Sequence, residues 1–168
     1  LDSPLVRDML FVVQKRIQAM SLVHEKLYSR EATTEVDLAD YTRELTMQVL
    51  DVVQGIVKPE VEFDLQSHMA SIDFAVPYGL LVNELVLNAY KHAFRGIKDP
   101  KMNIELFSSS GKLKLIVEDN GVGMNDESAG KDPVTLGMSL VDSLVSQLQG
   151  EQKVENHRGT RWVIDFPL

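Results

Sequence analysis

The stretch NELVLNAYKHAF, residues 83–94, decides how the rest of the chain can be organised. Its apolar residues recur at the three- and four-residue spacings of an α-helix that buries one side. Polar residues form a second stripe at helical spacing, namely Glu84, Asn88, Lys91, His92 and, just beyond the stretch, Arg95. A solvated face is the ordinary explanation of such a stripe. Asn88 favours a functional one, because asparagine is a poor helix former whose amide gains nothing in mid-helix unless it binds something.

Apolar periodicity places three more helices around this one. The central helix is expected to begin at Pro77 and to end near Phe94, since proline suits a first helical turn. Helices are also expected over residues 4–28, 38–52 and 136–148, with Asp37 as the N-cap of the second.

Alternating apolar and polar residues predict strands near residues 61–65, 101–107, 112–118, 151–155 and 160–166. The turn SSSG between the second and third of these predicts a β-hairpin. Strands and helices interleave without a regular alternation, which predicts an α+β fold: a two-layer sandwich with helices on one face of a mixed, mostly antiparallel sheet. The first helix does not fit this layer, so we assign it to a separate helical hairpin.

Composition excludes several classes of protein. The chain has 168 residues, 44% of them apolar, which suits a globular domain with a full core. A net charge of −8 argues against binding nucleic acid by neutralising its phosphates. The absence of cysteine excludes disulfides, thiolate nucleophiles and cysteine-bound metals. No apolar run approaches the roughly 20 residues that a bilayer requires.

Three further segments could contribute to a ligand site. Asp119 ends a predicted strand, and Gly121 and Gly123 after it would let the backbone approach a ligand closely. Gly137 marks a helix start whose free N–H groups suit an anion, and the Thr160 hydroxyl could reach a ligand. Each signal is weak alone, and the chain has neither a P-loop nor a strand-borne Rossmann glycine motif. The order and spacing of all four segments are far more specific.

Together the four segments resemble the ATP-binding domain of the GHKL superfamily (the Bergerat fold), which includes sensor histidine kinases and type II topoisomerases. Residues 83–94 look like its N box, 119–123 like its first glycine box and 136–141 like its second. Residues 16–28 and 36–41 are similar to the segment after the phosphoacceptor helix of two-component sensor kinases of the HisKA-like branch. The resemblance implies the end of a dimerisation and phosphotransfer region at residues 1–34 and a GHKL catalytic domain at 35–168.

The resemblance also implies roles for single residues. Glu84 would be the catalytic carboxylate, Asn88 the ligand of a Mg²⁺ ion that bridges the triphosphate, and Asp119 the acceptor for the adenine amine. The other ATP-binding residues would be Lys91, His92, Gly121, Gly123, Met124, Gly137, Met138 and Thr160. Residues 124–135 would form a mobile lid, although Thr135 stands where the family commonly has the first glycine of its second box.

The implied activity is that of an ATP-dependent protein-histidine kinase, with ATP and Mg²⁺ as cofactors. Its phosphoacceptor histidine is expected upstream of Leu1, because His24 matches a structural position and neither His68 nor His157 has a partner pattern. The resemblance implies a response regulator as partner, a homodimer in the full-length protein, no nucleic acid, no membrane contact and a cytoplasmic location. Two alternatives stay open: a phosphotransfer adaptor without ATPase activity, and a serine kinase of the anti-sigma-factor type.

Overall fold

The computed structural model describes residues 35–52, 58–124, 136–156 and 158–168, together with five positions of the first predicted helix. These five positions, residues 13, 14, 17, 21 and 25, are helical, in agreement with the helix expected over residues 4–28. The remaining positions of that helix lie outside the described residues.

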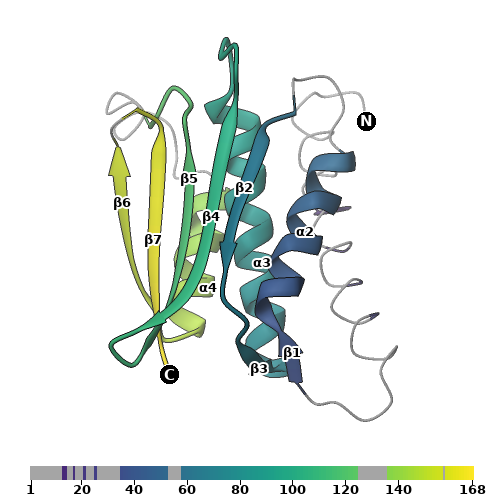
Figure 1. Ribbon diagram of the computed structural model, residues 1–168, viewed down its shortest axis with the longest axis vertical. Coiled ribbons are helices and arrows are strands. Elements are labelled where there is room, and N and C mark those ends of the chain that lie inside the picture. Colours follow the sequence, from purple (N-terminus) through teal and green to yellow (C-terminus); the bar gives the residue numbers. More distant parts are fainter. Residues whose placement is uncertain are drawn as a thin grey trace.

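The described residues form two layers, with helices on one face of a five-stranded sheet (Figure 1). The helices are α2 (Leu38–Val52), α3 (Ile72–Asn88) and α4 (Leu136–Gln147). The sheet has the order β2 (Glu60–Leu65), β4 (Lys101–Ser109), β5 (Lys112–Asp119), β7 (Thr160–Pro167) and β6 (Glu151–Asn156). Only β2 and β4 pair in parallel, across the α3 crossover; the other pairs are antiparallel. The α+β two-layer prediction is confirmed.

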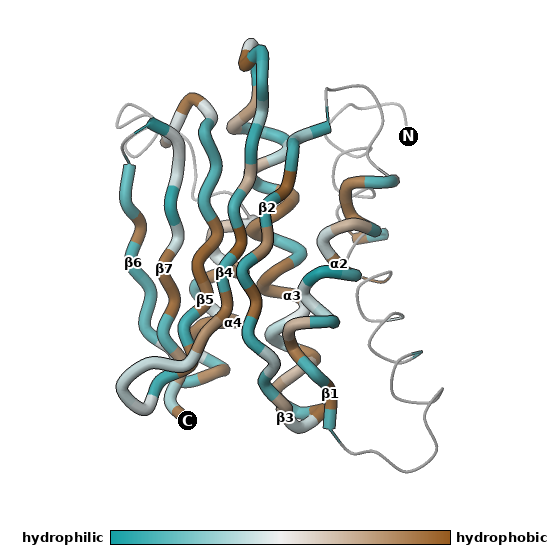
Figure 2. The backbone as a smooth tube through the Cα atoms, viewed as in Figure 1, coloured by the Kyte–Doolittle hydropathy of each residue, from teal (hydrophilic) through white to brown (hydrophobic). Residues whose placement is uncertain are grey.

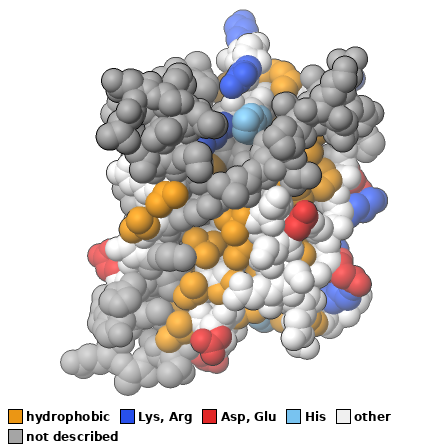
Figure 3. All heavy atoms as spheres, turned by 180° about the vertical axis from the view of Figure 1, so that it is seen from behind, with side chains coloured by type: hydrophobic (Ala, Val, Ile, Leu, Met, Phe, Trp, Pro, Cys, Tyr) orange, Lys and Arg blue, Asp and Glu red, His pale blue; other side chains and the backbone are white. Residues whose placement is uncertain are grey.

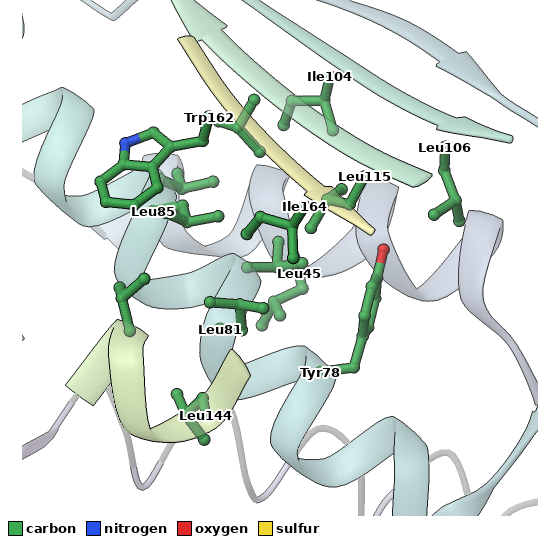
Figure 4. Packing of buried hydrophobic residues seen from close by; sticks show 14 of the residues in the cluster. Leu45, Tyr78, Leu81, Leu85, Ile104, Leu106, Leu115, Leu144, Trp162 and Ile164 are labelled. Atoms are coloured by element: carbon green, nitrogen blue, oxygen red, sulfur yellow. The ribbon is translucent and has the colours of Figure 1, made fainter. Parts of the chain in front are cut away.

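The core lies between the sheet and the helices. Along most of β4 and along β7 the residues alternate between buried and more exposed, whereas the central strand β5 buries three residues in a row, Leu115, Ile116 and Val117. Figure 2 shows apolar residues along these strands. Figure 4 shows side chains from both layers meeting, among them Leu81, Leu85, Ile104, Leu115 and Ile164, all at most 1% exposed. This burial supplies the main force that holds the two layers together.

Two features of the helical layer differ from the sequence prediction. First, α3 begins at Ile72, so Pro77 lies inside the helix rather than at its start. The proline removes one hydrogen bond to the Asp73 carbonyl, a loss tolerated near the start of a long helix whose face is buried. Second, two short strands that were not predicted, β1 (Glu35–Asp37) and β3 (Met69–Ser71), pair antiparallel and bring the starts of α2 and α3 together.

A third difference concerns the end of the central helix. Residues Ala89–Ala93 form a π-helix, η1, where the sequence pattern predicts a continuous α-helix. Such wider turns occur mostly as short insertions, frequently at functional sites. The predicted start of α2 is confirmed, because the Asp37 carboxylate accepts a hydrogen bond from the Ala39 N–H at 3.0 Å. No helix in the described ranges is long and apolar enough to cross a membrane.

Candidate functional site

Asp119 lies at the end of β5, beside the start of β7. The residue is 6% exposed, and its Oδ1 accepts hydrogen bonds from the N–H groups of Gly121 at 2.9 Å and Thr160 at 3.2 Å. Burial raises the pKa of this carboxyl; the two hydrogen bonds oppose the rise, and the charge of Glu118 adds to it. Because Oδ2 takes part in neither bond, it is the oxygen that can accept from a ligand.

The predicted first glycine box is held rigidly against the end of the central helix. The Val122 N–H donates to the Ala93 carbonyl at 2.9 Å, and a Cβ added to Gly121 would overlap the Ala93 backbone. On the other side, Asn120 Oδ1 accepts from the Lys101 N–H at 2.7 Å. The loop therefore has a fixed shape in the described structure, and only glycine allows the approach at position 121.

Glu84 and Asn88 lie where α3 meets the start of α4. Glu84 is 3% exposed, so the stripe is not a simple solvated face. Asn88 is half-buried, and its Nδ2 is buried without a hydrogen-bond partner among the residues that the structure describes. A Cβ added to Gly137 would lie 3.2 Å from Asn88 Oδ1 and 3.4 Å from Glu84 Oε2. Both predicted glycine boxes thus contact the predicted N box.

A basic cluster follows within and after η1. It consists of Lys91, His92 and Arg95, and Figure 3 shows Lys, Arg and His side chains gathered at one end of this face of the molecule. Partial burial lowers the pKa of His92, and the positive charges of Arg95 and Lys91 lower it further. His92 is therefore mainly neutral at pH 7. The cluster supplies local positive charge in a chain whose net charge is −8.

The remaining predicted residues differ in their burial and in their place in the fold. Thr160 is buried and joins Asp119 through its backbone N–H, whereas Met124 is 40% exposed at the end of the glycine loop. Met138 packs partly against the core cluster. His68 lies next to β3, and its N–H donates to Asp37 at 3.2 Å, at the other end of the fold (Figure 1). The expected lid from 125 onward, with Thr135, and also His24 and His157, lie outside the described residues.

Two asparagines near the site were not predicted from the sequence. Asn120 bonds the 99–101 segment, and Asn156 bonds the backbone of Met124. Asparagine is so common in turns that neither residue carries a signal in the sequence. Throughout the described ranges, no three His, Cys, Asp or Glu side chains converge as a metal site.

Comparison with known proteins identifies histidine kinases as relatives. Blue-light-activated histidine kinase 2 of Erythrobacter litoralis (strain HTCC2594) is 27% identical over 163 residues, which cover 93% of this chain and 46% of the relative. Sensor histidine kinase PdtaS of Mycobacterium tuberculosis (strain CDC 1551 / Oshkosh) is 26% identical over 168 residues, which cover 96% of this chain and 33% of the relative. The chain spans less than half the length of these two relatives.

A solved structure has the same architecture. The histidine kinase domain from the Erythrobacter litoralis EL346 blue-light activated histidine kinase matches with a TM-score of 0.82 and 26% identity, over 94% of this chain and 75% of that chain. Residues 1–53 match a family described as histidine kinase. Residues 75–168, more than half of the chain, match a second family model. The chain belongs to this second family, the histidine kinase-, DNA gyrase B- and HSP90-like ATPases.

Proposed function

We propose that this chain is the ATP-binding catalytic portion of a sensor histidine kinase, which transfers the γ-phosphoryl group of ATP to a histidine upstream of residue 1. One observation carries the proposal: three motifs that are distant in the sequence meet on one helix. Gly137 lies against Glu84 and Asn88, and the Asp119 loop is bonded to Ala93, five residues beyond Asn88. The match of residues 1–53 to a histidine kinase family supports this activity over that of a serine kinase.

The residues present fit an adenine nucleotide. The Oδ2 of Asp119, which takes part in neither of the two backbone hydrogen bonds, would accept from the adenine amine, whereas guanine would present the O6 acceptor there and be rejected. Lys91 and Arg95 would lie along the phosphates, and the N–H groups at the start of α4 would bind a phosphate oxygen. Phosphoryl transfer depends mainly on positioning and electrostatic stabilisation, which such an arrangement provides.

Magnesium fits the same place. The Asn88 amide is half-buried, its Nδ2 has no hydrogen-bond partner within the described part of the chain, and its Oδ1 is a hard oxygen ligand of the kind that Mg²⁺ prefers. A bound Mg²⁺ would neutralise charge on the triphosphate. Glu84 would polarise the incoming nucleophile, since a buried carboxylate next to the phosphates can act as a proton acceptor. We infer no further metal ligand among the described residues.

Titration calorimetry with ATP and Mg²⁺ tests the proposal. The parent chain should bind ATP, and Asn88→Ala should lose the part of the affinity that depends on Mg²⁺. Asn103→Ala is the matched control, because Asn103 bonds Glu105 at 2.8 Å within β4 and takes no part in the site. No heat from the parent at millimolar nucleotide would contradict the proposal and favour the adaptor.

A second experiment concerns the phosphoacceptor. After incubation with labelled ATP, these 168 residues should carry no acid-labile phosphate, because the acceptor histidine lies upstream in the proposed protein. Labelling on His24 would overturn that assignment. In the longer protein we propose a homodimer that passes its phosphoryl group to a response regulator in the cytoplasm, where ATP is available. The division into residues 1–34 and 35–168 stays a proposal.

A further inference from the structure

Asn156, the last residue of β6, holds the backbone of Met124 with both ends of its carboxamide. Its Oδ1 accepts a hydrogen bond from the Met124 N–H at 3.0 Å, and its Nδ2 donates to the Met124 carbonyl oxygen. An amide offers an acceptor and a donor side by side, so one orientation of the Asn156 side chain satisfies both backbone groups. Aspartate in the same place could accept but not donate at neutral pH.

The same hairpin end also holds the beginning of the glycine loop. Asn156 pairs with Thr160 across β6 and β7, and the Thr160 N–H donates to Asp119. The loop from Asp119 to Met124 is therefore attached at both ends to the end of one hairpin. Asn156 also packs directly on the loop, since a Cβ added to Gly123 would lie 2.5 Å from its Oδ1.

Between these two ends, the Val122 N–H is bonded to the Ala93 carbonyl. Removal of the Asn156 side chain would thus free the Met124 end while leaving the Val122 attachment in place. The clamp has a second consequence. Both backbone groups of Met124 are occupied by Asn156, so a ligand at this end of the loop would contact the Met124 side chain rather than its N–H or C=O.

We propose that Asn156 is a positioning residue of the nucleotide site, which fixes the backbone of Gly123 and Met124 where the adenine base is held. This inference rests on the proposed ATP-binding function. Asn156 acts through the loop and touches neither the phosphates nor the reacting atoms. Its loss therefore weakens the recognition of the base and spares the recognition of the triphosphate.

The experiment compares Asn156→Ala with the matched control Asn103→Ala. Calorimetry with ATP and Mg²⁺ should show a fall in affinity of about tenfold for Asn156→Ala, the scale expected when two hydrogen bonds that order a ligand-binding loop are removed. Competition with inorganic tripolyphosphate should give the same affinity within about twofold, because that probe has no base. Asn103→Ala should match the parent with both probes.

Amide hydrogen exchange supplies a readout that is independent of nucleotide. In Asn156→Ala the Met124 amide should exchange faster, whereas the Val122 amide should keep its protection. Asn156→Asp, which keeps the acceptor and the size of the side chain, should lie between the parent and the alanine variant in ATP affinity. It also provides the test if Asn156→Ala does not fold.

Three outcomes are distinct. If the parent binds no ATP, the proposed function fails. If the parent binds ATP and the folded Asn156 variants bind it equally well, the positioning role of Asn156 is wrong. Equal losses for ATP and tripolyphosphate would also overturn that role, because they would show a general disturbance of the site.

Discussion

Asp119 is a buried carboxylate whose surroundings oppose its charge. Burial raises its pKa, and the hydrogen bonds that two backbone N–H groups donate to Oδ1 compensate in part. A folded-state pKa above the unfolded value means that the ionised group costs the folded state stability at neutral pH. The residue is thus better suited to binding a ligand than to stabilising the fold, as is common where perturbed groups lie at functional sites.

Asp119→Asn should separate these two roles. Its oxygen can still accept from Gly121 and Thr160, but an NH₂ group would face the adenine amine. We expect ATP affinity to fall by about tenfold or more and the preference for ATP over GTP to shrink, since a donor suits the guanine O6. The free energy of unfolding at pH 7 should not fall. Calorimetry with both nucleotides and thermal unfolding measure this, and Asp64→Asn on the exposed part of β2 is the control. An unchanged ATP affinity would contradict the assignment.

His92 predicts a pH dependence of nucleotide binding. Its pKa lies below 6.5, so its positive charge appears only as the pH falls below that value. Protonation next to Lys91 and Arg95 adds positive charge along the proposed phosphate path. As the pH is lowered from 7.5 into the acid range below 6.5, ATP affinity in the parent should rise roughly two- to fivefold relative to His92→Gln. Comparison at each pH cancels the titration of ATP itself. Parallel pH profiles would show that His92 does not contact the phosphates.

At the scale of elements, hydrogen bonds at the start of α2 hold neighbouring segments together. Asp37 caps α2 and also accepts from the Ser67 hydroxyl at 2.8 Å and the His68 N–H at 3.2 Å, which ties the β1 strand to the segment before β3. Burial acts to raise the pKa of Asp37, but these hydrogen bonds together outweigh it and the pKa lies below the ordinary value of 3.8. The ionised carboxylate therefore stabilises the fold.

Asp37→Ala should lower the free energy of unfolding by about 1–2 kcal/mol at pH 7, the usual cost of losing an N-cap. A lowered folded-state pKa gives a contribution that is complete above the unfolded value of 3.8 and is lost as the pH falls through the folded value. The gap between parent and variant should thus shrink in acid below pH 3.8. Urea unfolding at several pH values measures it. Asp40→Ala, an exposed first-turn residue, is the control, and an equal cost there would argue against capping.

The π-helix η1 is an element that the periodicity of the sequence did not predict. It follows Asn88 directly, includes Lys91 and His92 of the basic cluster, and ends at Ala93, whose carbonyl accepts from the Val122 N–H. A wider turn at this place changes the direction in which the following residues project from the helix. The polar residues from Glu84 to Arg95 therefore do not lie along one straight line on the helix surface, as a period of 3.6 residues predicts.

At the scale of the whole molecule, one core joins the sheet and the three described helices. Figure 4 shows Leu85 of α3 and Trp162 of β7 among the buried side chains; Leu85 is 1% exposed and Trp162 5%. The polar face of the same helix carries Glu84 and Asn88. Stability and the site consequently depend on the two sides of one helix.

Leu85→Ala should lower the free energy of unfolding by about 3 kcal/mol, because the transfer free energy is lost and a cavity remains. Trp162, the single tryptophan, provides the fluorescence signal for urea unfolding. Leu168→Ala, at a site that is 62% exposed, should cost almost nothing. Similar losses in the two variants would mean that burial of Leu85 does not govern stability.

Periodicity predicted most of the fold. The helices over 38–52 and 136–148 and all five sheet strands appear close to their expected bounds, because the alternation of apolar residues that buries a face is local. The predicted start of α3 at Pro77 was wrong. Proline is most common in the first turn of a helix, but the packing of this long buried helix tolerates it further in. Strands β1 and β3 have three residues each and could not be recognised, because so short a segment has no period.

The sequence by itself determined most of the residues that form the helices and the five sheet strands, the net charge that any phosphate must overcome, and the motifs whose order resembles an ATPase. Only the tertiary structure decided the strand order, the approach of Gly137 to Glu84 and Asn88, and the attachment of Met124 to Asn156. The physical reason is the separation along the chain. Thr160 and Asp119 are 41 positions apart, and Met124 and Asn156 are 32. Such residues meet because packing of the whole core brings their elements together, and no local pattern of side chains encodes that meeting.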